Sequence, residues 1–409
     1  MTAHLYLSPE APAVRPEAPG SSWSASTLFD GADAVIGGVS LPTLAAKYGT
    51  PFYVLDEAEV RARARTYRHT LPQADIYYAA KAFLCGEMVR WLRDEGLGLD
   101  VCSGNELGLA LAAGFPPERI VLHRNAKSEA ELADAVDLRV GRVVVDSFTE
   151  IAHLAALADS ERPQSVLLRV APGISAEYDA AADAARSILT QPQLRLAGLH
   201  CHLGSQITEI EPFLVAVDRL VGLLALIRDR QGVTLPELNL GGEYAAAYRE
   251  HERGLEPARF AVLVCERLRK RCAEHRLRVP RLAVAPGRAI VAPAGTAVYR
   301  VLAVKDPPGG STIVAVDGGM SDNPRPALRT ARMIGRRSPE PLRPMRVVAR
   351  HCDAGDVLVP DAQLPGDLRP GDLLAIPASG AYQLSMTSGH RLVSRPLLIG
   401  VHEGREQLL

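Results

Sequence analysis

The feature that most constrains the fold is a regular alternation of short apolar runs and amphipathic helical patterns between about residues 73 and 288. The apolar runs predict eight strands, at 76–81, 99–102, 120–123, 143–146, 166–170, 196–202, 238–240 and 282–284. Helical patterns separate them, among them 87–95, 105–113, 129–137, 149–159, 213–230 and 257–275. Such alternation predicts parallel βαβ units, and eight units favour a closed (β/α)8 TIM-like barrel over an open sheet.

The pattern changes after residue 295. Here β-like runs are separated by proline and glycine turns, with no helical repeat, at 298–304, 311–316, 345–348, 372–376 and 391–398. We expect a β domain formed by 296–409 together with 28–55, because 51–55 is another predicted strand, and a barrel formed by 56–295. The Ala/Pro-rich residues 1–27 lack the pattern of a secretory signal and are predicted to be a flexible leader.

Composition excludes several classes of function. The 46 basic and 47 acidic residues give a net charge of -1, which favours neither nucleic acid nor a membrane surface as a partner. No apolar run is long enough to cross a bilayer. The six cysteines are scattered and form no CxxC pair, so we expect free thiols and a cytoplasmic location rather than a disulfide framework.

Candidate chemistry lies at the carboxyl ends of the predicted strands, where (β/α)8 barrels place their active sites. Lys81 closes an apolar aromatic run, and a desolvated lysine can form a Schiff base with a carbonyl. Lys81 could instead start the next helix and extend to water. Glycine loops at 241–242 and 285–288 follow neighbouring strands and suit a phosphate, although either loop could be an ordinary tight turn. Together these features suggest a pyridoxal phosphate (PLP) site.

Other motifs offer supporting groups. His200 and His202 alternate on one strand and face the same way, but no third ligand stands nearby, so ring stacking or proton transfer by His202 is favoured over a metal site. In the β domain, Arg325 could bind a carboxylate with both ends of its guanidinium. Cys352 lies beside carboxylates, which favour its protonated form. Each of these motifs alone also fits core packing or an ordinary turn.

Ten motifs in order resemble the PLP-dependent decarboxylases of the alanine-racemase-like fold (fold type III), the diaminopimelate and ornithine decarboxylase family, with the diaminopimelate decarboxylases most similar. The resemblance covers about residues 40 to 400 and rests on YYAAKAF, DVCSGNEL, HRNAKSEAEL, VDSFTEI, HCHLGSQI, LNLGGE, APGRAIVAPAG, VDGGMSDNPRPAL, HCDAGDVL and GAYQLSMTSGHRLVSRP.

The resemblance implies a role for each matching position. Lys81 would bind PLP covalently, and His202 would stack on its ring. The phosphate would be held by Ser205, Gly242, Gly287, Arg288 and Tyr382. Arg325 would bind a substrate carboxylate. Cys352 would be the proton donor and would act in the partner subunit's site, because family homodimers share their active sites head to tail. The reaction would exchange Lys81 for the substrate amine, release carbon dioxide and protonate the remaining carbon.

The chain departs from the family pattern at several positions. Ala285 stands where a glutamate usually keeps the pyridine nitrogen protonated, and Glu243, in place of a glycine, could replace that partner. At the substrate end, Asp353 replaces a glutamate and Arg329 a tyrosine, and 186–189 and 388–391 also differ. We therefore expect a specialised decarboxylase of secondary metabolism. Its substrate would be an amino acid or a carrier-bound aminoacyl group other than diaminopimelate, read in part by Arg329 and Asp353.

Two alternatives remain open from the sequence. A PLP-dependent racemase, epimerase or other carbanion enzyme would fit Ala285, because racemases of this fold also lack the carboxylate. The presence of Cys352 and the longer β domain argue against it. A non-catalytic binding homologue would fit the altered cofactor and substrate positions. The presence of Lys81, His202 and Cys352 argues against that interpretation.

Overall fold

The computed structural model describes residues 22–170, 178–242, 244–249, 252–324, 329–351, 353 and 355–409. Eight parallel strands close into a barrel in the order β10-β11-β12-β5-β6-β7-β8-β9, which confirms the predicted fold class. Their bounds are β5 Asp75–Ala79, β6 Gly98–Val101, β7 Ile120–Leu122, β8 Arg142–Val145, β9 Gln164–Val170, β10 Leu194–Cys201, β11 Glu237–Asn239 and β12 Arg281–Val284.

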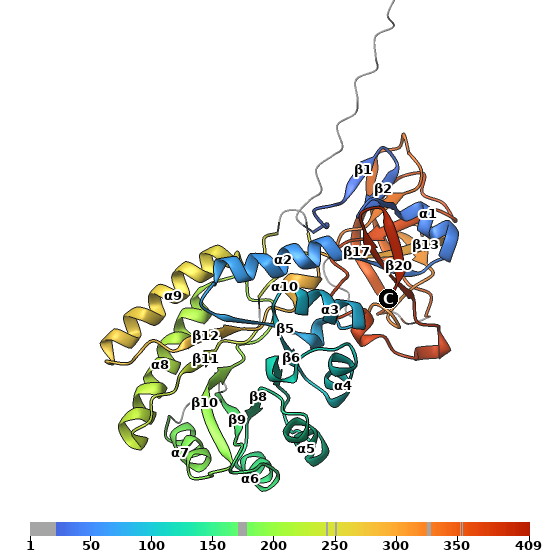
Figure 1. The fold of residues 1–409 in the computed structure, drawn as a ribbon. Coiled ribbons are helices and arrows are strands. Elements are labelled where there is room, and N and C mark those ends of the chain that lie inside the picture. The colour runs from blue at the N-terminus through green and yellow to red at the C-terminus, as the bar shows by residue number, and fades with distance from the viewer. Residues whose placement is uncertain are drawn as a thin grey trace, which may run out of the picture.

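Helices cover the outside of this barrel (Figure 1). They are α2 Glu57–Thr70, α3 Gly86–Asp94, α4 Gly104–Ala112, α5 Glu129–Asp137, α6 Phe148–Leu157, α7 Tyr178–Leu189, α8 Glu211–Gln231 and α9 Pro257–Glu274, with the short α10 Arg288–Val291 after β12. Serine side chains cap three of them: Ser103, Ser128 and Ser147 each accept a hydrogen bond from the backbone three residues later. These caps mark where each helix begins, and so where the loop that follows the preceding strand ends.

The inside of the barrel is packed with side chains and is not a pore. Val121, Val144, Leu167 and Ala197 form a buried layer inside it, with Tyr77 packed against them. Alternate residues of the same strands point outward and join the main core under the helices. This layer closes the barrel beneath the polar residues that follow at the strand ends.

The β domain combines an early segment of the described chain, blue in Figure 1, with its last segment, orange to red. Seven strands of its nine-stranded sheet follow the order β17-β16-β14-β13-β4-β19-β20. The other two branch from this path, because β18 pairs with β13 and β15 pairs with β18. The bounds are β4 Phe52–Asp56, β13 Gly295–Lys305, β14 Thr312–Val316, β15 Arg332–Ile334, β16 Leu342–Val348, β17 Val357–Pro365, β18 Leu373–Ile376, β19 Leu397–His402 and β20 Arg405–Leu408. A small sheet precedes it, formed by β1 Leu28–Asp30, β2 Asp33–Ile36 and β3 Val39–Ser40, followed by α1 Leu41–Tyr48.

Three local predictions differ from the structure. Lys81 does not end a strand, because β5 stops at Ala79 and a 3-10 turn spans Ala80–Ala82. The strand predicted at 391–398 begins only at Leu397, directly after Pro396, which has no N–H for a sheet ladder. Residues 22–27, predicted to belong to the leader, include a buried Trp23 that packs edge-on against Phe29.

Two chemical findings accompany the fold. The cysteines within the described ranges are free thiols, at 85, 102, 201, 265 and 272. Among the helices in the described part of the chain, none combines the length and the apolar composition needed to span a membrane.

Candidate active site

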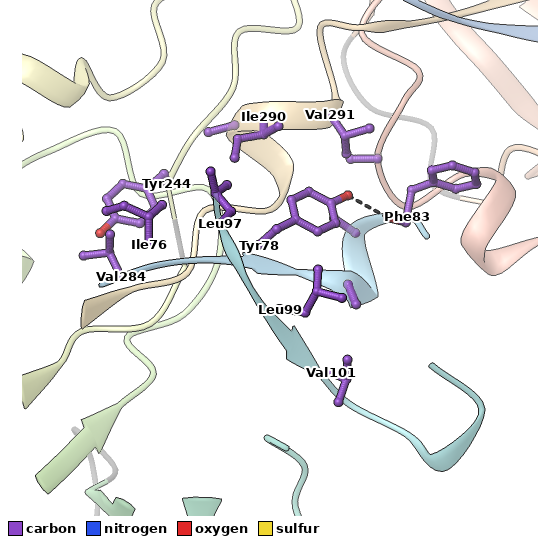
Figure 2. Packing of buried hydrophobic residues seen from close by; sticks show 14 of the residues in the cluster. Ile76, Tyr78, Phe83, Leu97, Leu99, Val101, Tyr244, Val284, Ile290 and Val291 are labelled. Atoms are coloured by element: carbon purple, nitrogen blue, oxygen red, sulfur yellow. Dashed lines mark hydrogen bonds between the residues drawn. The ribbon is translucent and has the colours of Figure 1, made fainter. Parts of the chain in front are cut away.

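Lys81 lies on a turn that is held from two sides. The Tyr78 hydroxyl donates a hydrogen bond to the Phe83 carbonyl at 2.7 Å, which closes the turn within the buried cluster shown in Figure 2. From the β domain, the backbone N–H of Tyr382 and the hydroxyl of Ser385 donate to the Ala82 carbonyl at 2.8 and 3.0 Å. The position of the Lys81 backbone therefore depends on both the barrel and the β domain.

A cavity of about 150 Å³ opens beside this turn, at the carboxyl ends of the barrel strands. Six of the predicted cofactor residues line it, together with Gly204 and Gln206, for which no role was predicted: Lys81, His202, Gly204, Ser205, Gln206, Gly242, Arg288 and Tyr382. The Gln206 side chain bonds the backbone of Ala246 with both its amide nitrogen and its oxygen, at 2.7 and 3.1 Å. The two loops that flank the cavity are thereby joined.

Arg288 provides the positive charge of the cavity. Its Nη2 donates to the Ser205 hydroxyl at 3.1 Å, and its Nη1 donates to the Tyr248 hydroxyl. The guanidinium carbon also lies 4.4 Å from the ring centroid of Tyr382. Within the described ranges no carboxylate forms an ion pair with Arg288. A guanidinium that meets only hydroxyls and rings retains its capacity to bind an anion.

Backbone contacts explain two of the predicted glycines. A Cβ on Gly242 would lie 1.6 Å from the Ala285 carbonyl oxygen, and one on Gly287 would lie 2.8 Å from the Ala79 carbonyl oxygen. The backbone N–H of Ala285 donates to the Gly241 carbonyl at 2.7 Å. The loops after β11 and β12 therefore meet backbone to backbone, and Gly287 also packs against the strand that leads to Lys81.

Beneath the cavity, polar side chains fill the upper end of the barrel. The rings of His123 and His200 are 4.2 Å apart, and those of His123 and His202 are 6.0 Å apart. His123 is bracketed by Asp100, whose Oδ2 is 3.4 Å from Nδ1, and by Arg169, whose Nη1 is 3.2 Å from Nε2. No role was predicted from the sequence for Asp100 or Arg169. The signal available for both was a charged residue inside an apolar strand.

His200 is the most enclosed member of this cluster, with 1% of its surface exposed. Neither of its ring nitrogens has a hydrogen-bond partner among the described residues. Burial lowers the pKa of His200 well below its usual range, and the neighbouring His123, Arg169, His202 and Lys81 lower it further. His200 is therefore neutral in the folded protein.

The charge of Lys81 also affects three nearby acidic groups, those of Glu106, Cys102 and Tyr382. Burial raises the pKa of Glu106, while the charge on Lys81 opposes that rise. Burial likewise raises the pKa of the Cys102 thiol and of the Tyr382 hydroxyl, and Lys81 opposes both shifts. The Cys102 backbone N–H donates to Glu106 Oε2 at 2.5 Å, which holds this carboxyl group at the end of β6.

The remaining predicted residues either do not line the cavity or lie outside the described part of the chain. Arg329 is 3% exposed, and its Nη1 donates to the Ser379 hydroxyl at 2.9 Å. Asp353 is exposed, with its Oδ2 3.5 Å from Nε2 of His390. Neither contributes to the cavity lining. Glu243, Arg325 and Cys352 lie outside the described residues.

The cavity fits a phosphate-bearing aldehyde such as PLP. Lys81 supplies the amine, His202 an imidazole, and Arg288 with Ser205 a cationic and hydroxyl-lined end. The close approach at Gly242 requires a residue without a side chain, as in loops that bring backbone N–H groups to a phosphate. The exception is Ala285, which is 1% exposed and has no group that could hold a proton for the cofactor ring.

Comparisons with known proteins agree with this geometry. The family described as "Pyridoxal-dependent decarboxylase, pyridoxal binding domain" matches residues 57–292. Diaminopimelate decarboxylase of Actinosynnema pretiosum subsp. auranticum is 46% identical over 413 residues, covering 95% of this chain and 92% of that protein. The Mycobacterium tuberculosis enzyme of the same name is 41% identical over 424 residues, covering 95% and 94%.

Solved structures show the same relationship. A protein from Aquifex aeolicus has a TM-score of 0.87 at 30% identity and covers 95% of both chains. Diaminopimelate decarboxylase from Helicobacter pylori, complexed with L-lysine, has a TM-score of 0.81 at 26% identity and covers 90% of this chain and 95% of that one. The cofactor is thus PLP, and the reaction is the decarboxylation of an amino acid. The chain belongs to the family of pyridoxal-dependent decarboxylases.

Proposed function

We propose that this decarboxylase is a specialised member of its family, acting on an amino acid or aminoacyl conjugate other than diaminopimelate. The main structural support for a decarboxylase is that Lys81 lies in one cavity with His202, Ser205 and Arg288. Lys81 lies on a turn that the Tyr78 hydrogen bond closes. The support for a different substrate is that Arg329 and Asp353 stand where the family pattern has a tyrosine and a glutamate, at positions expected to bind the substrate. The predicted cofactor residues that line the cavity match the family pattern, whereas Ala285 and Glu243 depart from it.

Bound in the cavity, PLP would supply a carbonyl carbon for the substrate amine and an acceptor for the electron pair left by departing carbon dioxide. The Lys81 amine would bind that carbon and then give way to the substrate amine. His202 would cover one face of the ring. Arg288 and the Ser205 hydroxyl, 3.1 Å apart, would hold the phosphate together with the backbone at Gly242 and Gly287 and with Tyr382.

The pyridine nitrogen has no partner at Ala285, because a methyl group neither donates nor holds a proton. Glu243 remains our candidate for that function. Its test is a Glu243→Gln variant, which would alter the pH dependence of the cofactor's absorption spectrum if Glu243 bears the proton. An unchanged dependence would remove Glu243 from this role.

At the substrate end we propose that Arg325 binds a carboxylate and that Asp353 contacts the distal part of the substrate. The Cys352 thiol would return a proton to the substrate Cα in the partner subunit's site of a homodimer. Mixing the separately inactive variants Lys81→Ala and Cys352→Ala tests the shared site, because a hybrid dimer contains one site with both native residues. Recovery of activity on mixing is expected. No recovery, although the subunits exchange, would contradict the shared site.

The substrate proposal is tested by measuring carbon dioxide release with diaminopimelate, L-lysine, L-ornithine and carrier-bound aminoacyl thioesters. We expect efficient release from a substrate other than diaminopimelate. Efficient turnover of diaminopimelate would contradict the proposal of a different substrate but would agree with the assignment as a decarboxylase. Turnover without carbon dioxide release would instead favour a racemase.

The proposed role in secondary metabolism has a separate genetic test. Deleting the gene should leave the producing organism able to grow without added lysine, because diaminopimelate decarboxylation would be carried by another enzyme. A strict lysine requirement that this gene alone relieves would contradict the role.

A further inference from the structure

Arg329 lies where the β domain meets the barrel. Its Nη1 donates to the hydroxyl of Ser379, on the loop after β18, at 2.9 Å. Its guanidinium carbon lies 5.5 Å from the ring centroid of Tyr248, on the loop after β11. Only 3% of its surface is exposed. A strongly basic side chain is thus enclosed between a β-domain hydroxyl and a barrel tyrosine.

In the part of the chain that the structure describes, no acid compensates the charge on Arg329. Among the described residues no carboxylate forms an ion pair with it, and its Nε has no hydrogen-bond partner. Arg336 of the same domain, in contrast, binds Asp372 at 2.6 Å and Asp367 at 2.9 Å. Burial lowers the pKa of Arg329, and the nearby charge of Arg288 lowers it further. Burying an unpaired cation costs free energy that a nearby anion would offset.

Tyr248 connects Arg329 to the cavity. Arg329 lies over the tyrosine ring, and the tyrosine hydroxyl accepts a hydrogen bond from Nη1 of Arg288. The Arg288 guanidinium carbon is itself 5.9 Å from the centroid of the same ring. With its other nitrogen, Nη2, Arg288 donates to Ser205 at 3.1 Å in the cavity lining. Two guanidinium groups therefore share one tyrosine, and the one nearer the cavity contacts the proposed phosphate site.

We propose that Arg329 is a positioning residue for the phosphate of PLP. It packs on Tyr248, which holds Arg288 in place, and it adds a second buried positive charge near the phosphate end of the cavity. The proposal rests on the proposed placement of the phosphate at Arg288 and Ser205. A buried charge is screened less by salt than one in water, so Arg329 attracts a doubly charged phosphate from behind Arg288 without contacting it.

Pyridoxal, which has the ring and aldehyde of PLP but no phosphate, makes this testable. The affinity of the apoenzyme for each compound is measured by absorbance titration in the native chain and in an Arg329→Met variant. We expect the variant to bind PLP about tenfold more weakly, because it loses a nearby buried charge and the packing that holds Arg288, and to bind pyridoxal within about twofold of the native chain. Equal losses for both compounds, or an unchanged PLP affinity, would overturn the proposal.

Two further variants keep the test decisive if Arg329→Met does not fold. Arg329→Lys retains the charge and should keep most of the preference for PLP over pyridoxal. Tyr248→Phe retains the ring but removes the hydroxyl that binds Arg288, and it should reduce the same preference. The double variant Arg329→Met, Tyr248→Phe should lose less than the sum of the two single effects, because both act on Arg288. Full additivity would contradict the link through Tyr248.

Two control variants distinguish the role of Arg329 from the proposed placement of the phosphate at Arg288 and Ser205. Arg336→Met removes a β-domain arginine held by Asp372 and should lower stability without changing the preference for PLP. Arg288→Met should abolish the preference. If Arg288→Met leaves it intact, the phosphate placement itself is wrong. If Arg288→Met removes it and Arg329→Met does not, only the role of Arg329 fails.

Discussion

Arg169 and Arg288, near the cavity, have different partners from two arginines at the opposite end of the barrel. At the amino ends of the strands, Arg142 and Arg281 meet carboxylates: Arg142 binds Glu237 at 3.0 Å and Arg281 binds Asp75 at 3.1 Å. At the carboxyl ends, Arg288 meets hydroxyls and tyrosine rings, and Arg169 meets His123 and Asn125. Within the described ranges no carboxylate pairs with Arg169 or Arg288.

The difference shows which end binds a ligand. Opposite charges at the amino ends neutralise one another, so that end contributes to holding the barrel closed. At the carboxyl ends, Lys81 and Arg169 lie near the neutral His200, and Arg288 lines the same cavity as Lys81 and His202. Cations gathered in this way favour the binding of an anionic cofactor or substrate at this end.

The assignment of the carboxyl ends of the strands as the end that binds the cofactor is tested most strongly by the variant Lys81→Ala. We expect the visible absorption band of the bound cofactor to disappear and decarboxylation to fall by roughly 10³-fold or more, because the reaction loses its positioned amine. Lys305→Ala, at the exposed end of β13, is the matched control and should behave as the native chain. A Lys81→Ala variant with activity within tenfold of the native chain would show that the cavity is not the site of chemistry.

A smaller but still large effect is expected from Gly242→Ala. The added methyl group would meet the Ala285 carbonyl oxygen at 1.6 Å, so the two loops at the phosphate end must separate. We expect a loss of about 3 kcal/mol in the free energy of unfolding, as for overpacked sites, together with weakened PLP binding. Gly108→Ala, in helix α4 with open space around it, is the control and should be neutral or stabilising. Similar stability in both variants would contradict the close contact.

The variant Glu237→Gln tests the opposite end of the barrel, where arginines pair with carboxylates. Glu237 is buried and holds Arg142, so its neutralisation should leave the arginine uncompensated and lower the free energy of unfolding by about 2 kcal/mol. Because this pair lies at the opposite end of the barrel from the cavity, PLP affinity should not change. Denaturant unfolding and absorbance titration measure the two quantities. A loss of PLP affinity without a loss of stability would reverse the assignment of the two ends.

The smallest expected effect is on pH dependence. His200 has its pKa lowered by burial, so below about pH 6.5 the unfolded chain binds a proton at this residue that the folded chain does not. Stability should therefore fall with decreasing pH, by up to about 1.4 kcal/mol per pH unit from this residue alone. Replacing His200 with Gln should remove that part of the slope in unfolding measurements, whereas replacing the exposed His153 should not. Equal slopes in the native chain and in His200→Gln would contradict a neutral buried imidazole.

Much of the barrel could be predicted because its signals are local. The helix predicted at 129–137 has the bounds of α5, Glu129–Asp137, since a serine cap, an acidic first turn and periodic apolar residues all lie within that segment. The strand at 391–398 was misplaced because its apolar residues continue past Pro396, where pairing begins only with Leu397. The burial of Trp23 was missed because its cluster includes, besides the nearby Phe29, residues distant in sequence such as Val298 and Ile399.

The cofactor residues that follow strands were equally accessible to sequence reasoning. In a parallel barrel the carboxyl ends of all strands meet at one face, so Lys81, His202, Gly242 and Arg288 had to approach one another once eight strands were predicted. Arg169 was missed because it lies within its strand rather than after it. The connection between Arg329 and Arg288 had no sequence signal, because it passes through Tyr248 on a different loop.

The sequence by itself determined the alternation of strands and helices, the barrel that follows from it, and the amine, imidazole, glycine and arginine groups at the strand ends. These depend on residues that are neighbours along the chain or are brought together by a repeating topology. Only the tertiary structure decided the turn that carries Lys81, closed by Tyr78 and held by Ser385, and the burial of Arg329 between Ser379 and Tyr248. The Tyr78 contact is local, but the contacts of Ser385 and Arg329 join segments far apart in sequence, and they form only when the β domain packs on the barrel.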